Sequence, residues 1–257
     1  MMAIFLIVTS FVASFLTLFS GFGLGTILMP VAALFFPVAT AVALTAFVHL
    51  LNNLFKLSLL WRQVHWPVLL RFGLPAMAMA VPGAWLLARL SLLPELGNYE
   101  IAGVTAEITP IKFLAGLLLI VFATMEWLPF FNRLKISLRW LPVGGALSGF
   151  FGGLTGHQGA FRSLFLIRAG LDKNQLVASN AAIASMVDIA RLIVYGLNMK
   201  LLLAHVDMSL LVLATVASFA GVWTGTAFLY KMTISLIQKI VAVMLYALGF
   251  LLMAGLI

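Results

Sequence analysis

The sequence predicts an all-α fold, a polytopic integral membrane helical bundle, from three observations. Of the 257 residues, 64% are hydrophobic and only 9% are charged, whereas roughly a quarter of the residues in an ordinary soluble domain are charged. The mean hydropathy is +1.18. About eight apolar segments follow one another, and each has the roughly 20 residues that one bilayer crossing requires. Nearly the whole chain is therefore expected to lie in lipid, without a separate soluble domain.

Proline, glycine and charged residues separate these segments. Pro37 follows the first segment, Pro110 begins the fourth, and Asp172 with Gln175 has the spacing of a helix cap before the sixth. No Lys or Arg precedes the first segment and no small-residue cleavage site ends it, so we expect mature protein and not a signal peptide. The predicted segments are residues 2–36, 38–61, 66–90, 110–131, 140–171, 173–197, 207–230 and 234–257.

Composition also excludes several kinds of chemistry. Cysteine is absent, which removes disulfides, thiolate metal sites and cysteine nucleophiles. The net charge is +8 and the pI is near 10.2, which in a soluble protein would suit nucleic acid. In a membrane protein the excess of Lys and Arg is expected in cytoplasmic loops that face anionic lipid. The expected surroundings are therefore a lipid bilayer, and no nucleic acid.

The charges in two connections predict the orientation. Residues 91–109 carry Glu95, Glu100 and Glu107 and no Lys or Arg, whereas the loop at 133–139 carries only basic charges. By the positive-inside rule the basic loop is cytoplasmic and the acidic connection is outside. If every predicted segment crosses, both termini are cytoplasmic, in a multi-pass protein of the cell inner (plasma) membrane.

Two segments contain a glycine-rich break. As one straight helix, residues 2–36 would measure about 52 Å and overshoot a hydrocarbon core of roughly 30 Å. Three glycines between Ser20 and Thr26, followed by Pro30, mark where this helix is expected to break. Residues 144–159 contain a second run of closely spaced glycines. Matched breaks in two halves of a chain indicate a transporter built from repeats, with its site at the unwound backbone.

An ungapped offset of 135 residues aligns the two halves. It pairs Asn53 with Asp188 and Lys56 with Arg191, besides many apolar positions. Polar residues are rare in hydrophobic helices, so this coincidence indicates two repeats of four segments, at residues 1–131 and 132–257. Four crossings in each half would make the repeats parallel, whereas a re-entrant crossing in each broken segment would invert them. Both arrangements stay open.

The breaks also carry a family resemblance. The run Gly21-Phe22-Gly23-Leu24-Gly25 leading to Pro30, its copy at residues 152–159, and the Ala-rich polar helix after each resemble the sulfite exporter TauE/SafE family. The resemblance covers almost the whole chain. It implies a bacterial or archaeal inner-membrane permease for sulfite, sulfoacetate, other sulfonates or organic anions, most often in the export direction.

Polar residues form a stripe on two of the predicted helices. Charged residues at mid-membrane cost about 2.5–3.5 kcal/mol on insertion scales, so they usually line a cavity or pair with a partner. In the second segment the stripe is Thr45, His49, Asn52, Asn53 and Lys56, and in the sixth it is Asn180, Asp188 and Arg191, with Ser185 nearby.

The charged members of the stripes have two interpretations each. Asp188 and Arg191 either form an ion pair on the helix surface near the membrane edge, or Asp188 carries a proton for coupling. Lys56 and Arg191 lie near segment ends, so their charged tips are expected to snorkel to the headgroups, although both are also candidates for coupling.

Arg162 is the strongest candidate for contact with a substrate. It lies in the first turn of the half-helix after the second break, where its charge and the helix dipole together suit an anion. The alternative is an internal pair with Asp188 or Glu126. His157 and Gln158 would add donors at the break, although a histidine there is often only bonded to a neighbouring carbonyl.

The first break is expected to supply the matching half-helix start through Gly23, Gly25 and Thr26, unless its glycines serve only close helix packing. The candidate substrate-binding residues are Arg162, His157, Gln158, Gly23, Gly25, Thr26, Thr45, His49, Asn52, Asn53 and Asn180, and the candidate coupling residues are Asp188, Lys56 and Arg191.

The predicted function is secondary transport of a small anion, with no catalytic residue, cofactor or metal. Its expected partners are the small anionic substrate, the bilayer, a coupling proton or sodium ion, and a second copy of the chain in a homodimer. Two alternatives remain. Product formation or bound metal without transport would favour an intramembrane enzyme, and silent substitutions at Arg162 would favour a structural subunit of a membrane complex.

Overall fold

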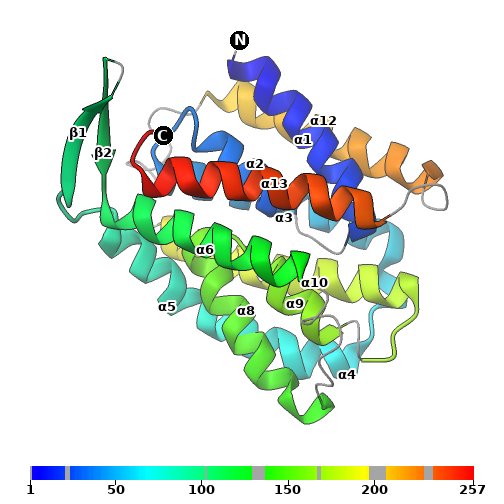
Figure 1. Ribbon diagram of the computed structural model, residues 1–257. Helices are drawn as coiled ribbons and strands as arrows, with labels where there is room; N and C mark the ends of the chain where they lie inside the picture. Colours follow the sequence, from blue (N-terminus) through cyan, green and yellow to red (C-terminus); the bar gives the residue numbers. More distant parts are fainter. Residues whose placement is uncertain are drawn as a thin grey trace.

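The computed structural model describes residues 2–20, 24–101, 103–128, 137–166, 169–196, 207–228 and 234–257. Helices pack side by side, and a two-stranded β-hairpin stands off one end of the bundle (Figure 1). The long helices are α1 (Met2–Ser20), α3 (Val38–Leu60), α5 (Leu74–Leu90), α6 (Pro110–Trp127), α8 (Leu141–Thr155), α10 (Lys173–Gly196), α12 (Met208–Phe228) and α13 (Ile234–Met253). The shorter elements are α2 (Leu24–Ala32), η1 (Trp61–Gln63), α4 (Trp66–Val68), the π-helical η2 (Leu69–Gly73), β1 (Gly97–Ile101), β2 (Val104–Ile108), η3 (Leu138–Trp140) and α9 (Gly159–Leu166).

The predicted all-α membrane fold is confirmed. Within the described ranges, four helical spans are long and apolar enough to cross a membrane, and α1, α6 and α13 contribute shorter apolar helices. The four spans are Val38–Gln63, Trp66–Leu90, Lys173–Gly196 and Met208–Gly225. The acidic connection at 91–109 contains the antiparallel strands β1 and β2, which the hydrophobic pattern did not predict.

The first predicted segment is broken, and its second part returns along the first. α1 ends at Ser20 and α2 begins at Leu24; residues 21–23, with Gly21 and Gly23, lie outside the described part. The ring of Phe5, near the start of α1, lies 6.1 Å from that of Phe35, which follows α2. The end of α2 therefore lies beside the start of α1, and the two form a helical hairpin.

The second broken segment folds back in the same way. Gly156 follows α8 with φ +82°, a left-handed conformation that glycine adopts without steric cost and that commonly ends helices. Ser148 Oγ in α8 donates to the carbonyl of Gln158 at 2.9 Å. Gly144, near the start of α8, lies against the ring of Phe165, near the end of α9. Thus α9 runs back along α8.

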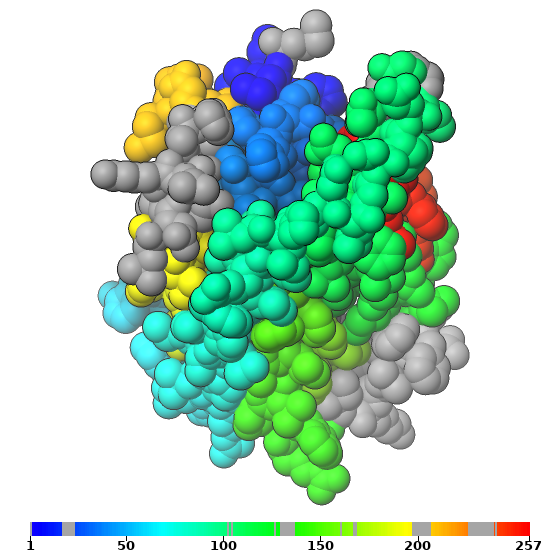
Figure 2. Space-filling model, turned by 90° about the vertical axis from the view of Figure 1, so that its left-hand side faces the viewer, coloured from blue at the N-terminus to red at the C-terminus, as the bar shows by residue number. Residues whose placement is uncertain are grey.

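Small residues allow α8 to pack tightly and in parallel on α5. A Cβ atom on any of three α8 glycines spaced four residues apart would overlap a carbonyl oxygen of α5 or of η2, which precedes it; such contacts are typical of membrane helices that approach backbone to backbone. The facing pairs are Gly145 with Phe72, Gly149 with Ala76, and Gly153 with Ala80. Figure 2 shows the two helices side by side on the lower part of one face.

Two other helix pairs are antiparallel. His49 in the middle of α3 meets Asp188 in α10, whereas His65, after the end of α3, meets Ser179 near the start of α10. Helix α6 likewise runs against α13, since Gly116 lies beside Met253 and Thr124 bonds to Tyr246.

These directions bear on the predicted repeats. α2 and α9 begin 135 residues apart, and so do α3 and α10. The division into repeats stays a prediction. If the halves are repeats, however, the antiparallel α3–α10 and α6–α13 pairs make them inverted, which is the arrangement that re-entrant segments allow.

The C-terminus packs on the β-hairpin. Glu107 N donates to Gly255 O at 3.0 Å, and the Tyr99 hydroxyl donates to Ala254 O at 2.8 Å. Figure 1 shows both termini at the end of the bundle that carries β1 and β2, here called the β-hairpin end, with α4 at the opposite end, the α4 end. In Figure 2 the β-hairpin is an arm at the upper right.

The prediction that the acidic connection and the C-terminus lie on opposite sides of the membrane is therefore wrong. The acidic connection and the C-terminus lie at the same end of the bundle, so the connection cannot be outside while the C-terminus is cytoplasmic. The reason is that each broken segment is a helical hairpin, which returns the chain to its starting side and changes the count of crossings.

Two helix starts are capped by aspartates. Gln175 N donates to Asp172 Oδ1 at 2.9 Å and Asp172 N donates to Gln175 Oε1 at 3.3 Å, which confirms the predicted cap of α10. At α12, Ser209 N donates to Asp207 Oδ1 at 2.8 Å. The hydrogen bonds from the Ser209 side chain and backbone hold the pKa of Asp207 below its ordinary value.

Candidate functional site

The interior of the bundle holds an unbalanced set of charges. Among the side chains that the structure describes, the buried charged residues are Lys56 on α3, Arg162 on α9, and Asp188 and Arg191 on α10. Three are cations and one is a carboxylate. Charges buried in a membrane protein are costly unless they are paired, so the partners of these four residues indicate what the site can bind.

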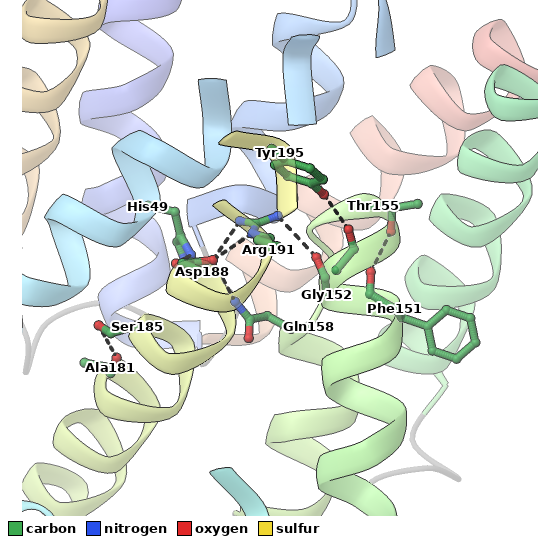
Figure 3. A network of polar contacts seen from close by, with 11 residues as sticks. His49, Phe151, Gly152, Thr155, Gln158, Ala181, Ser185, Asp188, Arg191 and Tyr195 are labelled. Carbon is green, nitrogen blue, oxygen red and sulfur yellow. Dashed lines mark hydrogen bonds and ion pairs between the residues drawn. The ribbon is translucent and has the colours of Figure 1, made fainter. Parts of the chain in front are cut away.

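Asp188 is the centre of a hydrogen-bond network (Figure 3). Its Oδ2 lies 2.7 Å from His49 Nδ1 on α3. Its Oδ1 accepts from Arg191 Nε at 3.0 Å and lies 2.7 Å from Arg191 Nη2. Gln158, in the turn between α8 and α9, donates its Nε2 to the same oxygen at 3.4 Å. The network thus links α3, α10 and the second helical hairpin.

Arg191 and Tyr195 hold the end of α8. Arg191 Nη1 donates to Gly152 O at 3.2 Å, and the hydroxyl of Tyr195, one turn further along α10, donates to Gly153 O. The last carbonyls of a helix lack partners within the helix and carry its negative dipole end, so a cation and a hydroxyl donor stabilise them. These contacts support the position of the helical hairpin turn.

The predicted locations of three charged residues are corrected. The Asp188–Arg191 pair forms, but it is fully buried and not on the helix surface. Neither Arg191 nor Lys56 snorkels, since their exposed fractions are 0% and 7%. Nearness to a segment end predicted snorkelling, but the neighbouring helices enclose both side chains.

Arg162 is buried without a full set of partners. Only 3% of it is exposed, and neither its Nε nor its Nη1 has a hydrogen-bond partner among the described residues. The predicted alternative pair with Asp188 does not form within the described contacts, because Asp188 is bound to His49, Arg191 and Gln158 instead. The side chain of Glu126, the other predicted partner, lies outside the described part.

The helical hairpin turn places two more buried polar groups near α9. His157 Nδ1 lies 3.2 Å from Thr155 Oγ1, and its ring stacks on Phe122 with centroids 6.0 Å apart. His157 Nε2 and Gln158 Oε1 are buried and have no partner among the described residues. The histidine therefore bonds to the Thr155 hydroxyl through Nδ1.

The two breaks meet in space. A Cβ atom on Gly25 would lie 3.3 Å from the carbonyl oxygen of Gly156 and 3.5 Å from Thr45 Cγ2. Thr26 is buried beside Gly25, and the buried Thr45 Oγ1 has no partner in the described ranges. The start of α2 thus lies against the turn that precedes α9, as the matched breaks predicted. Gly23 lies outside the described residues.

The polar stripe on α3 is only partly bonded within the bundle. Asn52 Nδ2 donates to Ser14 Oγ at 2.9 Å and to Ser218 O at 3.2 Å, so it ties α3 to α1 and α12. The buried atoms Asn52 Oδ1, Asn53 Nδ2 and, on α10, Asn180 Oδ1 have no partner among the described residues.

The family model for Sulfite exporter TauE/SafE matches residues 6–252 of the chain. The chain belongs to the sulfite exporter TauE/SafE family. Its membership implies a membrane sulfite exporter or permease, because the family is one of transporters. No curated protein and no solved structure matches the chain.

The match to the TauE/SafE family includes both breaks and all four buried charges. Sequence reasoning missed Tyr195, Ser148 and the pair Ser14 and Ser218. Tyr195 follows Arg191 by four residues and so lies on the same helix face, a signal that could have found it. The serines carry no such signal, since their roles depend on which helix packs beside them.

Proposed function

We propose that this member of the TauE/SafE family is a permease that carries small sulfur-containing or organic anions, such as sulfite, sulfoacetate and other sulfonates, out of the cell across the plasma membrane. One observation carries the proposal. The guanidinium of Arg162 is buried, and two of its nitrogens have no described partner.

An anion is the ligand that suits this guanidinium. Hydrogen bonds between a guanidinium and an oxyanion are charge-assisted and roughly twice as strong as neutral ones. Arg162 also lies in the first turn of α9, where the helix dipole favours negative charge. His157, Gln158 and Thr26 are buried close to the same turn and offer further hydrogen bonds.

The arrangement of the helices supports transport over static binding. Two helical hairpins meet where Gly25 faces Gly156, and several transporter folds bind anions at such half-helix starts near mid-membrane. Because α3 and α10 are joined there by the His49–Asp188 bond, rocking of one half against the other would change access to the site. A proton or sodium gradient is the proposed driving force, with Asp188 and its partners as the coupling group.

Flux into liposomes tests the proposal. Purified protein with Arg162→Gln is compared with wild type for uptake of sulfite, sulfoacetate and simple carboxylates. Arg139→Gln is the matched control, because Arg139 is exposed and stacks on Trp140. We expect flux with wild type and the control and at least a tenfold loss with Arg162→Gln, since one charge-assisted contact contributes that much or more.

Two outcomes contradict the proposal. Equal flux for Arg162→Gln and wild type would show that Arg162 does not bind the transported anion. The proposed transport function would be wrong if no tested anion entered the proteoliposomes faster than it enters protein-free liposomes, provided that the protein remains monodisperse in detergent. Imposed proton or sodium gradients in the same assay test the coupling.

A further inference from the structure

We infer that Lys56 is the second cation of the Arg162 site, and that it determines a preference for doubly charged over singly charged oxyanions. This inference rests on the proposed function, because it concerns the anion that the site accepts. It goes beyond that function in assigning a specificity-determining role to a residue whose position at a segment end predicted only snorkelling.

The balance of buried charge is the first argument. Among the described side chains, Lys56, Arg162 and Arg191 are buried cations and Asp188 is the sole buried carboxylate. Asp188 pairs with Arg191 through Nε at 3.0 Å and Nη2 at 2.7 Å. Within the described ranges neither Lys56 nor Arg162 forms an ion pair. A ligand with two negative charges would balance them, whereas a monoanion would leave one cation uncompensated.

The positions of these two cations are the second argument. Lys56 lies two turns after His49 on the same face of α3, and Arg162 lies one turn after Gln158 at the start of α9. His49 and Gln158 both contact Asp188, at 2.7 and 3.4 Å, so the two cations flank the same carboxylate. No hydrogen bond or ion pair in the described ranges includes Lys56 Nζ. Two like charges enclosed by helices repel each other, and a shared anion converts this repulsion into attraction.

The other acids of the chain do not balance Lys56 in the described structure. They lie in connections or at helix starts and are exposed, apart from Glu126, whose side chain lies outside the described part. The exposed acids are Glu95, Glu100, Glu107, Asp172 and Asp207. A bound anion is therefore the partner that the described interior leaves for Lys56.

The test compares the charge preference of wild type and Lys56 variants. Binding and flux are measured at mildly alkaline pH with sulfite and sulfoacetate as dianions and methanesulfonate as a monoanion. Lys56→Gln removes the charge, Lys56→Arg keeps it, and Lys239→Gln is the matched control on an exposed lysine of α13. We expect Lys56→Gln to lower the ratio of dianion to monoanion affinity about tenfold or more, because one charge-assisted contact is lost. Lys56→Arg and Lys239→Gln are expected to keep the wild-type ratio.

The outcomes separate this inference from the proposed function. An unchanged ratio in Lys56→Gln, with anion flux intact in wild type, overturns the role of Lys56 and leaves the permease. A ratio lowered equally in Lys239→Gln also overturns it, because the effect would then be one of surface charge. Absence of flux in wild type overturns both. If Lys56→Gln does not fold, Lys56→Met, which keeps the apolar stem, is measured instead.

A second, independent inference concerns orientation. We infer that the α4 end faces the cytoplasm and that both termini and the β-hairpin lie outside. The helical hairpins return the chain to its starting side, so α1 and α3 begin at the β-hairpin end, as the Phe5–Phe35 contact requires. The C-terminal contacts of Ala254 and Gly255 with the β-hairpin place the other terminus at the same end.

The charges at the two ends differ in sign. Five basic and one acidic described residues lie toward the α4 end: Arg62, Arg71, Arg139, Asp172, Lys173 and Lys239. Two basic and four acidic ones lie at the β-hairpin end: Arg89, Glu95, Glu100, Glu107, Lys112 and Asp207. Cytoplasmic segments are enriched in Lys and Arg. This asymmetry emerges only when each broken segment is a helical hairpin, because straight crossings would place residues 172–173 on the outer side.

Single cysteines in the cysteine-free chain test the orientation. Intact cells expressing Asn98→Cys, Asp172→Cys or Leu256→Cys are treated with a membrane-impermeant maleimide. We expect labelling at positions 98 and 256 in intact cells and at 172 only after permeabilisation. Straight crossings throughout predict labelling at 98 and 172 but not at 256, and that result would overturn the inference.

Discussion

Replacing Asp188 with asparagine removes the sole described buried carboxylate while keeping the shape of the side chain. In the wild-type chain this carboxylate contacts His49 at 2.7 Å, Arg191 at 3.0 and 2.7 Å, and Gln158 at 3.4 Å. In the Asp188→Asn variant the buried Arg191 loses its counter-charge and, of its described bonds, keeps the one to the Gly152 carbonyl.

The expected loss follows from breaking one buried ion pair. Removing a single partner of such a pair costs about 3–5 kcal/mol, because the remaining charge is left uncompensated. The double variant Asp188→Asn/Arg191→Met removes both charges and leaves the excess of buried charge as in wild type. We expect it to recover about half of the loss or more, the remainder reflecting the lost bond to Gly152, worth about 1 kcal/mol.

Equilibrium unfolding in mixed detergent micelles measures these changes through the fluorescence of the six tryptophans. Asp172→Asn is the matched control, because Asp172 is an exposed helix cap and asparagine caps helices about as well as aspartate, so its change should stay within about 0.5 kcal/mol. If Asp188→Asn is as stable as Asp172→Asn, the carboxylate does not hold the network together and the reasoning fails.

Three further predictions concern packing, a structural polar residue and a helix cap. Gly149→Ala places a Cβ onto an α5 carbonyl, so it should destabilise the protein by about 1–3 kcal/mol. Gly196→Ala is the control and should be near neutral, because its Cβ meets no atom within 4 Å. Thermal unfolding midpoints followed by tryptophan fluorescence distinguish the two variants. Asn52→Ala should lower the stability by about 1–2 kcal/mol, because its bonds to α1 and α12 are lost. It should leave the anion KM in liposomes unchanged, and a raised KM would show that Asn52 contributes to the anion site. The pKa of Asp207 is lowered by the bonds from Ser209, so its support for the start of α12 is present above the ordinary aspartate pKa and is lost as pH falls through the lowered one. Amide exchange at Ser209, measured relative to the pH dependence of an unstructured peptide, should therefore become less protected at acid pH.

Several parts of the fold could be predicted because they depend on local chemistry. A 2–36 segment too long for the bilayer must break, and its glycines mark the position, as the end of α1 at Ser20 confirms. The Asp172 cap needs only two residues at the right spacing. Arg162 was identifiable because it lies in an apolar stretch far from any headgroup, so its burial follows from its position alone.

Other parts depended on neighbours that the sequence does not identify. Burial of Lys56 follows from the helices that enclose it, and the same position at a bundle edge would have let it snorkel. Asn52 and Thr45 share one predicted stripe, yet Asn52 bonds to α1 and α12 whereas Thr45 faces Gly25 at the meeting of the breaks.

The sequence by itself determined the membrane environment, the helical class, the two breaks and the few polar residues that are costly in lipid, because each follows from composition or spacing along one chain. Only the tertiary structure decided that the broken segments fold back and that the acidic connection shares its end with the C-terminus. It also decided that Asp188 is bound by Arg191 and His49, while Arg162 and Lys56 form no ion pair with a described residue. The physical reason is that pairing and direction arise from contacts between helices distant in sequence, and one-dimensional hydrophobicity carries no information about which helices those are.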